Sequence, residues 1–437
     1  MKNIIVCSVV ICVSLLSVPT YAASLPEEGV RERGSLERQY DMAALRATTN
    51  ISNQSGARIV ADFYANSKVE NTAISPPTII STFGAIAHIA KGKTKQELQK
   101  LLFLRGNERL AFSTLNDYLS EIELYDSRGY LLVKGSISDI NGDMQSEILE
   151  KFGTAFRSTD LSEDADGELP GPCGPATAVD FKFIPEINEV IESSPDTALI
   201  ACSEMLLEGR YPSFWKIELE DNLRPFRFDN GRKSIPFLYG SVDGYQMVTI
   251  NGERGYRFQL DVADMAIVQC KNGTALKQLA KNIATNGMRV QSGRRILRQT
   301  ALHIPEVGFL SEFNLVEYAK VKGLATPFTP KQAEYIIPGI YCSNAFAESA
   351  FEVSEYGIGL VQRQILIMEN NPCDGADPGA MDGDEEERNR RLLSNIIIDS
   401  PYLMVITERR LGTILAMAFI ANPEIEVEEE FDDDSED

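Results

Sequence analysis

Three arginines in the last third of the chain have the chemistry of a protease target. Arg388, Arg390 and Arg391 lie within residues 370–394, a stretch rich in Asp, Glu and Gly. Such charge density leaves almost nothing to bury, so we expect a long, exposed, acidic loop. A trypsin-like specificity pocket holds an arginine through a charge-assisted bond. The pattern predicts cleavage between residues 389 and 392, although the arginines can equally serve to balance the acidic run beside them.

The sequence offers few residues that could support catalysis by the chain itself. The sequence contains two histidines, His88 and His303. That is too few for a histidine metal site and leaves almost no choice for a Ser-His-Asp triad. His88 lies in an apolar, helix-like run and is interpreted as a hydrogen-bonded core residue. We therefore expect no enzyme, no metal and no cofactor.

The N-terminus has the features of a secretory signal. A single lysine precedes the apolar run 4–18, and small residues follow it. The run is too short to span a membrane, so we expect a signal peptide (1–22), cut after Ala22 or Ala23, and a secreted, extracellular protein without a membrane segment. Residues 23–49 are interpreted as a polar leader. Three sequons are candidates for glycosylation in an exported chain: Asn50, Asn53 and Asn272.

The cysteines do not form a disulfide scaffold. Five remain after removal of the signal, an odd number that leaves one thiol unpaired or paired between chains. Cys202 and Cys270 lie in apolar, strand-like runs and are interpreted as core thiols. Cys173 and Cys373 lie in Gly/Pro-rich segments and are candidates for a disulfide with each other.

The chain is strongly acidic, with a formal net charge of −22. Like charges repel, so the composition argues against nucleic acid as a partner. Part of the charge is local, because residues 424–437 contain ten carboxylates and no basic residue. We expect either a solvated, disordered tail or an electrostatic lure for a basic protein surface.

Helical patterns precede strand patterns along the chain. Apolar residues recur with helical spacing between residues 57 and 102, where Thr94 and Glu97 form a capping box that predicts a new helix start. From residue 197 onward, short β-rich runs dominate. No linker divides these patterns. The sequence therefore predicts a single α+β domain over residues 50–423.

Seven separated segments, in the same order, resemble motifs of the serpin family. They are 71–79 (NTAISPPTI), 90–94 (AKGKT), 207–209 (LEG), 302–305 (LHIP), 355–357 (EYG), 400–402 (SPY) and 421–423 (ANP). Each motif is short, but their order and their spread over the chain are specific.

The resemblance implies a serpin-like fold with about nine helices, three β-sheets and an exposed reactive loop. In inhibitors of the family, a serine protease cleaves this loop, which then inserts into the central sheet and drags the acyl-enzyme with it. The hinge of the loop corresponds to Glu355 and Gly357. Counting back from the SPY motif by the family's spacing reaches Arg390 or Arg391, whereas counting forward from the hinge reaches Asn371; we prefer the backward count.

The sequence departs from the family pattern in three ways. Inhibitors follow the hinge glycine with small residues, but here Ile358 and Leu360 must be packed. Gln362 and Gln364 must also be buried, at about 1–3 kcal/mol each if they are unpaired. The loop is long, with 46 positions from Glu355 to Pro401. Finally, residues 163–191, where the family places a helix across the central sheet, begin with a Gly/Pro-rich stretch.

Two functions are compatible with these features. We prefer a monomeric, extracellular inhibitor of a trypsin-like serine protease that acts by loop cleavage and insertion. The alternative is a non-inhibitory serpin that acts as a binding or carrier protein, or as a protease substrate.

Overall fold

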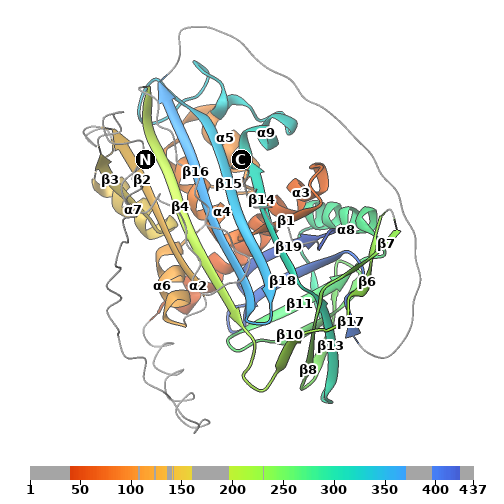
Figure 1. Cartoon of the computed structure of the whole chain (residues 1–437). Coiled ribbons are helices and arrows are strands. Elements are labelled where there is room, and N and C mark those ends of the chain that lie inside the picture. The colour runs from red at the N-terminus through yellow and green to blue at the C-terminus, as the bar shows by residue number, and fades with distance from the viewer. Residues whose placement is uncertain are drawn as a thin grey trace, which may run out of the picture. The chain divides into compact units, whose positions relative to one another are not determined.

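Helices form most of the first part of the chain and strands most of the second, as expected of an α+β protein (Figure 1). The computed structural model describes residues 40–106, 109–122, 125–134, 140, 142–159, 196–229, 231–370 and 396–423. The predicted signal peptide, most of the predicted leader, the Gly/Pro-rich stretch at 163–191 and the acidic tail lie outside these residues.

The helices precede and flank the sheets. Three of them continue one another: α2 (Met42–Ile51), the π-helical turn η1 (Ser52–Gly56) and α3 (Ala57–Asn66). The others are α4 (Pro76–Ile89), α5 (Gly92–Leu101), α6 (Phe112–Glu121), α7 (Gly142–Phe152), α8 (Gly273–Asn286), α9 (Leu315–Val321) and the short 3-10 helix η3 (Thr326–Phe328). With the first three counted as one, the described residues hold seven longer helices, fewer than the nine or so that the resemblance implies.

The central sheet is mostly antiparallel. Its order is β14 (Val307–Asn314), β15 (Ile340–Ser354), β16 (Gly357–Asn370), β4 (Thr197–Arg210), β2 (Tyr125–Lys134) and β3 (Thr154–Thr159). Only the β2–β3 pair is parallel among these neighbours.

The remaining described strands form two further sheets and one two-stranded ribbon. The seven-stranded sheet has the order β1 (Asn71–Ile74), β19 (Ile414–Ile420), β18 (Tyr402–Glu408), β11 (Ala263–Gln269), β10 (Glu253–Gln259), β9 (Tyr245–Ile250) and β12 (Val290–Ile296). The four-stranded sheet has the order β17 (Ile396–Ile397), β13 (Thr300–Pro305), β8 (Phe237–Val242) and β5 (Lys216–Leu219). The ribbon pairs β6 (Arg224–Phe228) with β7 (Gly231–Ile235).

Helix α4 is the centre of the core. Ser75 precedes it in an extended conformation, and Pro76 and Pro77 occupy its first turn, where their fixed φ and missing N–H groups are tolerated. Every residue of α4 except His88 is buried, as expected for a helix that is apolar on all sides. His88 lies at the rim of the core, with its Nε2 atom 3.3 Å from a carboxylate oxygen of Glu147.

The folded domain begins earlier than residue 50. Helix α2 starts at Met42, within the predicted leader, and buries Leu45, Thr48 and Thr49. The backbone N–H of Ala111 donates to the Thr48 hydroxyl over 2.9 Å, and the hydroxyls of Thr49 and Thr413 lie 2.8 Å apart. The leader assignment is therefore wrong for residues 42–49, because threonines with tertiary partners form a buried face that hydropathy does not reveal.

The predicted capping box is also wrong. Helix α5 begins at Gly92, so Thr94 lies inside it. The Thr94 hydroxyl accepts a hydrogen bond from the backbone N–H of Glu334 over 2.8 Å. The Glu97 carboxylate accepts from the N–H and the hydroxyl of Thr326, over 2.9 and 2.8 Å. Thr94 and Glu97 therefore bond to residues more than two hundred positions away in the sequence, and not to the start of α5 as the local motif predicted.

The cysteines differ in part from expectation. Cys270 and Cys342 are buried free thiols, which confirms the interpretation of Cys270. Cys202 is disulfide-bonded, and its partner lies outside the described residues. The interpretation of Cys202 as a thiol is therefore wrong, because an apolar run identifies a strand but not what lies over its face.

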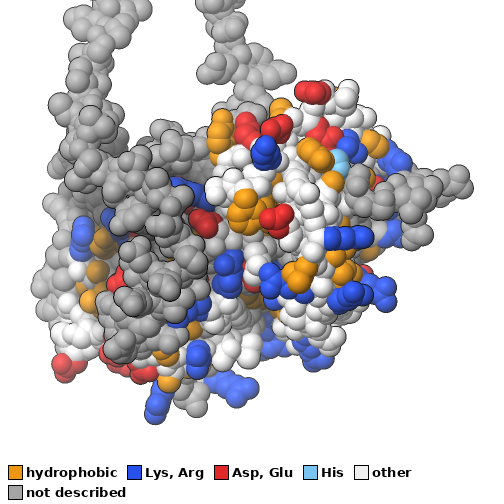
Figure 2. Space-filling model, turned by 90° about the horizontal axis from the view of Figure 1, so that it is seen from below, with side chains coloured by type: hydrophobic (Ala, Val, Ile, Leu, Met, Phe, Trp, Pro, Cys, Tyr) orange, Lys and Arg blue, Asp and Glu red, His pale blue; other side chains and the backbone are white. Residues whose placement is uncertain are grey.

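The charge is unevenly distributed over the surface. Lys and Arg side chains gather on the described part of the face seen in Figure 2. The edge strand β12 is exposed along its length except at Ile296, and carries Arg294 and Arg295. The charge-based argument against anionic ligands therefore holds for the chain as a whole and not for each face. None of the described helices is long and apolar enough to cross a membrane.

The bonds of Glu97 give a test of the α5 contact. Burial raises the pKa of Glu97, but the hydrogen bonds from Thr326 and Lys93 outweigh it and hold this pKa below its ordinary value. Replacing Glu97 with Ala should lower the free energy of unfolding by about 1.5–3 kcal/mol at neutral pH, as measured by denaturant titration. Because the folded-state pKa is depressed, the loss should shrink as the pH falls through it.

Lys93→Ala is the matched control. Lys93 is 70% exposed and lies 3.4 Å from Glu97, so its loss should change the same quantity by less than about 0.5 kcal/mol. Equal effects of the two substitutions would contradict the role given to Thr326.

Candidate reactive-loop site

The segment that follows the predicted hinge is a strand of the central sheet. Strand β16 lies between β15 and β4 and pairs with both along its length (Figure 1). Ser354 and Gly357 face each other across the β15–β16 hairpin, and Glu355 and Tyr356 form its turn. The residues after the hinge are therefore inserted in the sheet in this structure.

Gly357 is required by the geometry of the hairpin. Its φ is +151°, and a Cβ atom on it would lie 2.7 Å from the carbonyl oxygen of Gly209 on β4. A side chain cannot be placed there without moving the backbone of β4. The glycine thus allows β16 to approach β4 at the point where insertion begins.

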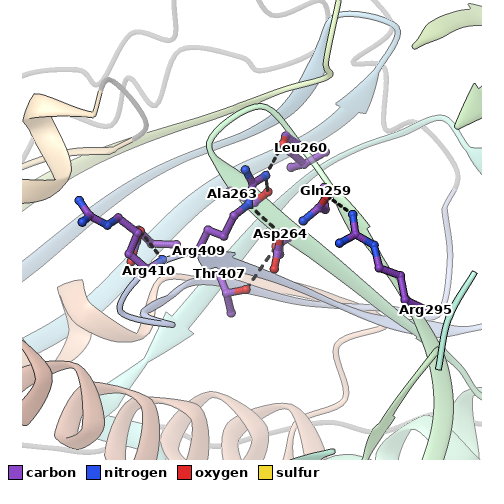
Figure 3. Close-up of polar contacts among 9 residues, drawn as sticks. Gln259, Leu260, Ala263, Asp264, Arg295, Thr407, Arg409 and Arg410 are labelled. Atoms are coloured by element: carbon purple, nitrogen blue, oxygen red, sulfur yellow. Dashed lines mark hydrogen bonds and ion pairs between the residues drawn. The ribbon is translucent and has the colours of Figure 1, made fainter. Parts of the chain in front are cut away.

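A polar cluster holds the turn between β10 and β11 (Figure 3). Arg409 donates to the carbonyls of Leu260 and Ala263, over 2.5 and 2.9 Å, and to Asp264 over 3.2 Å. The same β10–β11 turn is joined to β4, because the N–H of Asp261 donates to the carbonyl of Arg210 over 3.2 Å. The turn at the end of the seven-stranded sheet therefore holds the residue that pairs with Gly357.

The bulky residues after the hinge are packed. Ile358 and Leu360 have no exposed surface. Alternate residues of a strand lie on one face, so Ile358, Leu360, Gln362 and Gln364 share the face that meets α4. Burying an aliphatic side chain of this size contributes about 1.5–3 kcal/mol. The size of Ile358 and Leu360 therefore favours the inserted strand. From the small residues that inhibitors of the family have at these positions, the opposite effect was expected.

The two buried glutamines are paired with the N-terminus of α4. The N–H of Ser75 donates to the side-chain oxygen of Gln362 over 2.7 Å. In the amide orientation that suits its neighbours, Gln364 accepts from the N–H of Ile79 over 3.0 Å and donates to the carbonyl of Thr78 over 3.2 Å. In that orientation the two amides also bond to each other. The N–H of Ser75 has no intrahelical partner, so Gln362 caps α4, whereas the N–H of Ile79 is shared between Gln364 and the Ser75 carbonyl. Both amides are therefore paired, and the expected penalty does not arise.

The same helix satisfies the polar groups of the neighbouring strands. The Thr78 hydroxyl lies 2.8 Å from the phenol oxygen of Tyr125 on β2, and the Thr82 hydroxyl lies 2.6 Å from that of Ser203 on β4. Burial raises the pKa of Tyr125, which keeps it a hydrogen-bond donor. Sequence reasoning missed this polar row, although Ser75, Thr78 and Thr82 recur at the helical spacing of one face.

The opposite face of β16 carries a buried charge. Arg363 is 1% exposed and donates from Nη2 and Nε to one oxygen of Glu348 on β15, over 2.8 and 3.3 Å. Beside it, Ile365 packs with Ile200 and Leu132 of the neighbouring strands. Sequence reasoning did not identify Arg363, because a lone arginine in a β-rich run gives no sign of a partner on another strand.

The far side of the loop rejoins a different sheet. Ile396 and Ile397 of β17 pair in parallel with Leu302 and His303 of β13. The three scissile-bond candidates, Arg388, Arg390 and Arg391, lie outside the described residues, as does Asn371. The structure therefore brings Gln362 and Gln364 together with the N-terminus of α4, places Gly357 beside β4, and does not test the position of the cleavage site.

The length of the loop permits both pairings in one uncut chain. Residues 371–395, 25 in all, separate β16 from β17. Fully extended, they reach at most about 80–90 Å. The 14-residue strand β16 rises by only about 47 Å. A chain of this length can hold β16 in the central sheet while β17 stays in the four-stranded sheet, without cleavage.

The sequon asparagines occupy different environments. Asn50 is exposed near the end of α2. Asn53 donates to the carbonyl of Gly412 over 2.7 Å and accepts from the N–H of Ile414 over 2.8 Å. Asn272 caps α8 by accepting from the N–H of Ala275 over 2.9 Å. Glycosylation of these residues stays a prediction.

The described residues contain no cluster of metal ligands. No group of three or more His, Cys, Asp or Glu side chains is placed to hold an ion within the described ranges. His303 of β13 is buried, with Nδ1 2.5 Å from a carboxylate oxygen of Glu220.

Comparisons with known proteins agree with the motifs and the architecture. No family model matches the chain. Neuroserpin of Gallus gallus is 22% identical over 407 residues, which cover 86% of this chain and 93% of that protein. Neuroserpin of Homo sapiens is 22% identical over 392 residues, covering 82% and 88%.

Solved structures show the same fold. Cleaved Serpin 42Da superposes with a TM-score of 0.62 at 14% identity, covering 87% of this chain and 98% of that one. A loop-inserted, cleaved ovalbumin mutant superposes with a TM-score of 0.58 at 14% identity, and the match covers 85% of this chain and 100% of that one. The ordered motifs, the relatives matched over most of their length and the shared three-sheet architecture lead to one conclusion: the chain has the serpin fold and is similar to neuroserpins over most of its length.

Proposed function

We propose that the protein is a secreted, monomeric inhibitor of a trypsin-like serine protease, which traps the protease by inserting residues 357–370 into the central sheet after cleavage of the loop. One observation carries this proposal. The segment after the hinge fits the gap between β15 and β4 with its apolar side chains buried and its glutamines paired.

Trapping requires that insertion be strongly favourable. Strand β16 gains a ladder of backbone bonds on both edges. Its α4 face adds apolar burial and helix capping, and its other face adds the Arg363–Glu348 ion pair. These contributions have the same sign, so the loop has a stable destination once it is free to move. Arg390 or Arg391 supplies the side chain for the protease pocket, with Arg388 as the further candidate.

A second function is favoured by a separate observation. The uncut chain already holds β16 and β17 in their two sheets. A protein that rests in this state has no insertion left to perform and acts as a non-inhibitory binding or carrier protein, or as a substrate. The two functions differ in what a protease does to the protein, which makes them separable.

Incubation with trypsin should give a covalent complex that survives a denaturing gel, and mass spectrometry should locate the cut between residues 389 and 392. The matched variant, with Arg388, Arg390 and Arg391 replaced by Gln, should give neither product. Clean cleavage at the same place without a complex would reject inhibition and support the second function.

Replacement of Gly357 by Val should convert the inhibitor into a substrate, because the new Cβ meets the Gly209 carbonyl and delays insertion until the acyl-enzyme has hydrolysed. The ratio of complex to cleaved product on the gel should fall at least about tenfold, the effect of about 1.4 kcal/mol on the barrier. Gly142→Ala is the control, since nothing lies within 4 Å of a Cβ there, and it should leave the ratio unchanged.

Replacement of Gln362 by Leu should leave the Ser75 N–H without its partner in the inserted state. The loop-cleaved protein should lose about 1–3 kcal/mol of stability in denaturant titration. The exposed Gln332, replaced in the same way, should have no measurable effect. An unchanged midpoint for Gln362→Leu would mean that the capping of α4 does not stabilise the inserted strand.

A further inference from the structure

A row of alternating charges crosses four strands of the central sheet. It runs through Glu348 on β15, Arg363 on β16, Glu204 on β4 and Arg128 on β2. Arg363 is the register partner of both Glu348 and Glu204, and Glu204 is the partner of Arg128. Directly opposed residues of neighbouring strands project from the same face, so the four side chains form one line across the sheet. This face is the one opposite α4, because Gln362 and Gln364 point to the helix.

The arginine is the most enclosed member of the row. Arg363 is 1% exposed, whereas Arg128, nearer the edge, is 67% exposed. The guanidinium bonds Glu348 directly. Burial raises the pKa of Glu204 to about 7, while Arg363 and then Arg128 act on it in the opposite direction. Arg363 thus interacts favourably with carboxylates on both of its neighbours.

Without β16, the two carboxylates would lose this intervening cation. Strands β15 and β4 both run antiparallel to β16, so they are parallel to each other. When they close on each other, the gap between them shrinks from two strand spacings to one, from about 9.5 Å to about 4.8 Å. Glu348 and Glu204 would then share one face of adjacent strands, and at a pH above the raised pKa of Glu204 their like charges destabilise the sheet. In the central sheet without β16, a positive charge placed between Glu348 and Glu204 would therefore be favourable.

We propose that Arg363 is the positioning residue of the inserting strand: its guanidinium enters between Glu348 and Glu204, favours the opening of the sheet and sets the register of β16. A slip of one residue would turn Arg363 toward the hydroxyl row of α4 and away from Glu348 and Glu204. A slip of two would put Val361 or Ile365 between the two glutamates. Each wrong register thus separates the charge from its partners, whereas the backbone ladder alone has no such preference.

This inference deepens the proposed function, but its test does not use trapping. The protein is cleaved in the loop, and hydrogen–deuterium exchange of residues 357–370 is measured together with the denaturation midpoint, at a pH above the pKa of Glu204. Arg363→Met, which keeps the length of the side chain, should exchange at least about tenfold faster and lower the midpoint, because a partly buried carboxylate pair is left without its cation. Arg363→Lys should restore part of the protection.

The decisive variant also removes the two acids. Arg363→Met combined with Glu348→Gln and Glu204→Gln should recover most of the lost protection, since no like charges then face each other. If Arg363 matters only through packing, the triple variant will be no better than Arg363→Met, and the proposal is wrong. Arg128→Met is the matched control and should have little effect, because Arg363 still faces Glu204.

The outcomes separate this inference from the proposed function. Recovery in the triple variant without any trypsin complex in the wild type would reject inhibition and keep the role of Arg363. A trypsin complex formed by the wild type, without recovery of protection in the triple variant, would support inhibition and reject the role of Arg363.

Discussion

The pairing of Gln362 and Gln364 with the N-terminus of α4 is the interaction on which the rest of the central sheet depends. A strand in the middle of a sheet over a helix has no access to water, so any polar side chain on that face needs a protein partner. The first turn of α4 contains Pro76 and Pro77, which have no N–H, and its next donors lie under β16. The backbone groups at the start of α4 and the side-chain amides of β16 therefore serve as hydrogen-bond partners for each other.

The same constraint explains the hydroxyl row of α4. A helix that is buried on all sides would normally be apolar throughout. Here Thr78 and Thr82 face β2 and β4, where Tyr125 and Ser203 meet them. Such contacts are directional, so they favour one position of each strand over α4 more strongly than apolar packing does. In the proposed mechanism the sheet opens between β15 and β4, and contacts of this kind would hold the flanking strands in position over α4.

The opposite face of β16 adds a second, independent constraint. The buried ion pair of Arg363 and Glu348 stabilises only the correct register, because a buried charge without its partner is strongly unfavourable. The length of residues 371–395 adds a third feature, since it lets one uncut chain occupy both sheets. The stability of the six-stranded sheet and the length of the segment that joins β16 to β17 are therefore set by different parts of the chain.

The sequence by itself indicated the serpin fold, the α+β order and the turn before Gly357, because these depend on local motifs, hydrophobic spacing and glycine. Gly357 is predictable in this sense, and its strained φ and close contact with Gly209 give the physical reason. The start of α2 was missed because its buried face uses threonines. Thr94 and Glu97 were assigned to each other because a local motif carries no information about Glu334 or Thr326.

Only the tertiary structure decided whether the residues after the hinge fit the sheet. From the sequence, Ile358, Leu360, Gln362 and Gln364 were obstacles to insertion, because small residues are the family pattern and unpaired amides are unfavourable in a core. The outcome depends on what lies opposite them, namely the open N-terminus of α4 and the space between β15 and β4. Burial and pairing are properties of contacts between distant segments, and a single segment of sequence does not contain them.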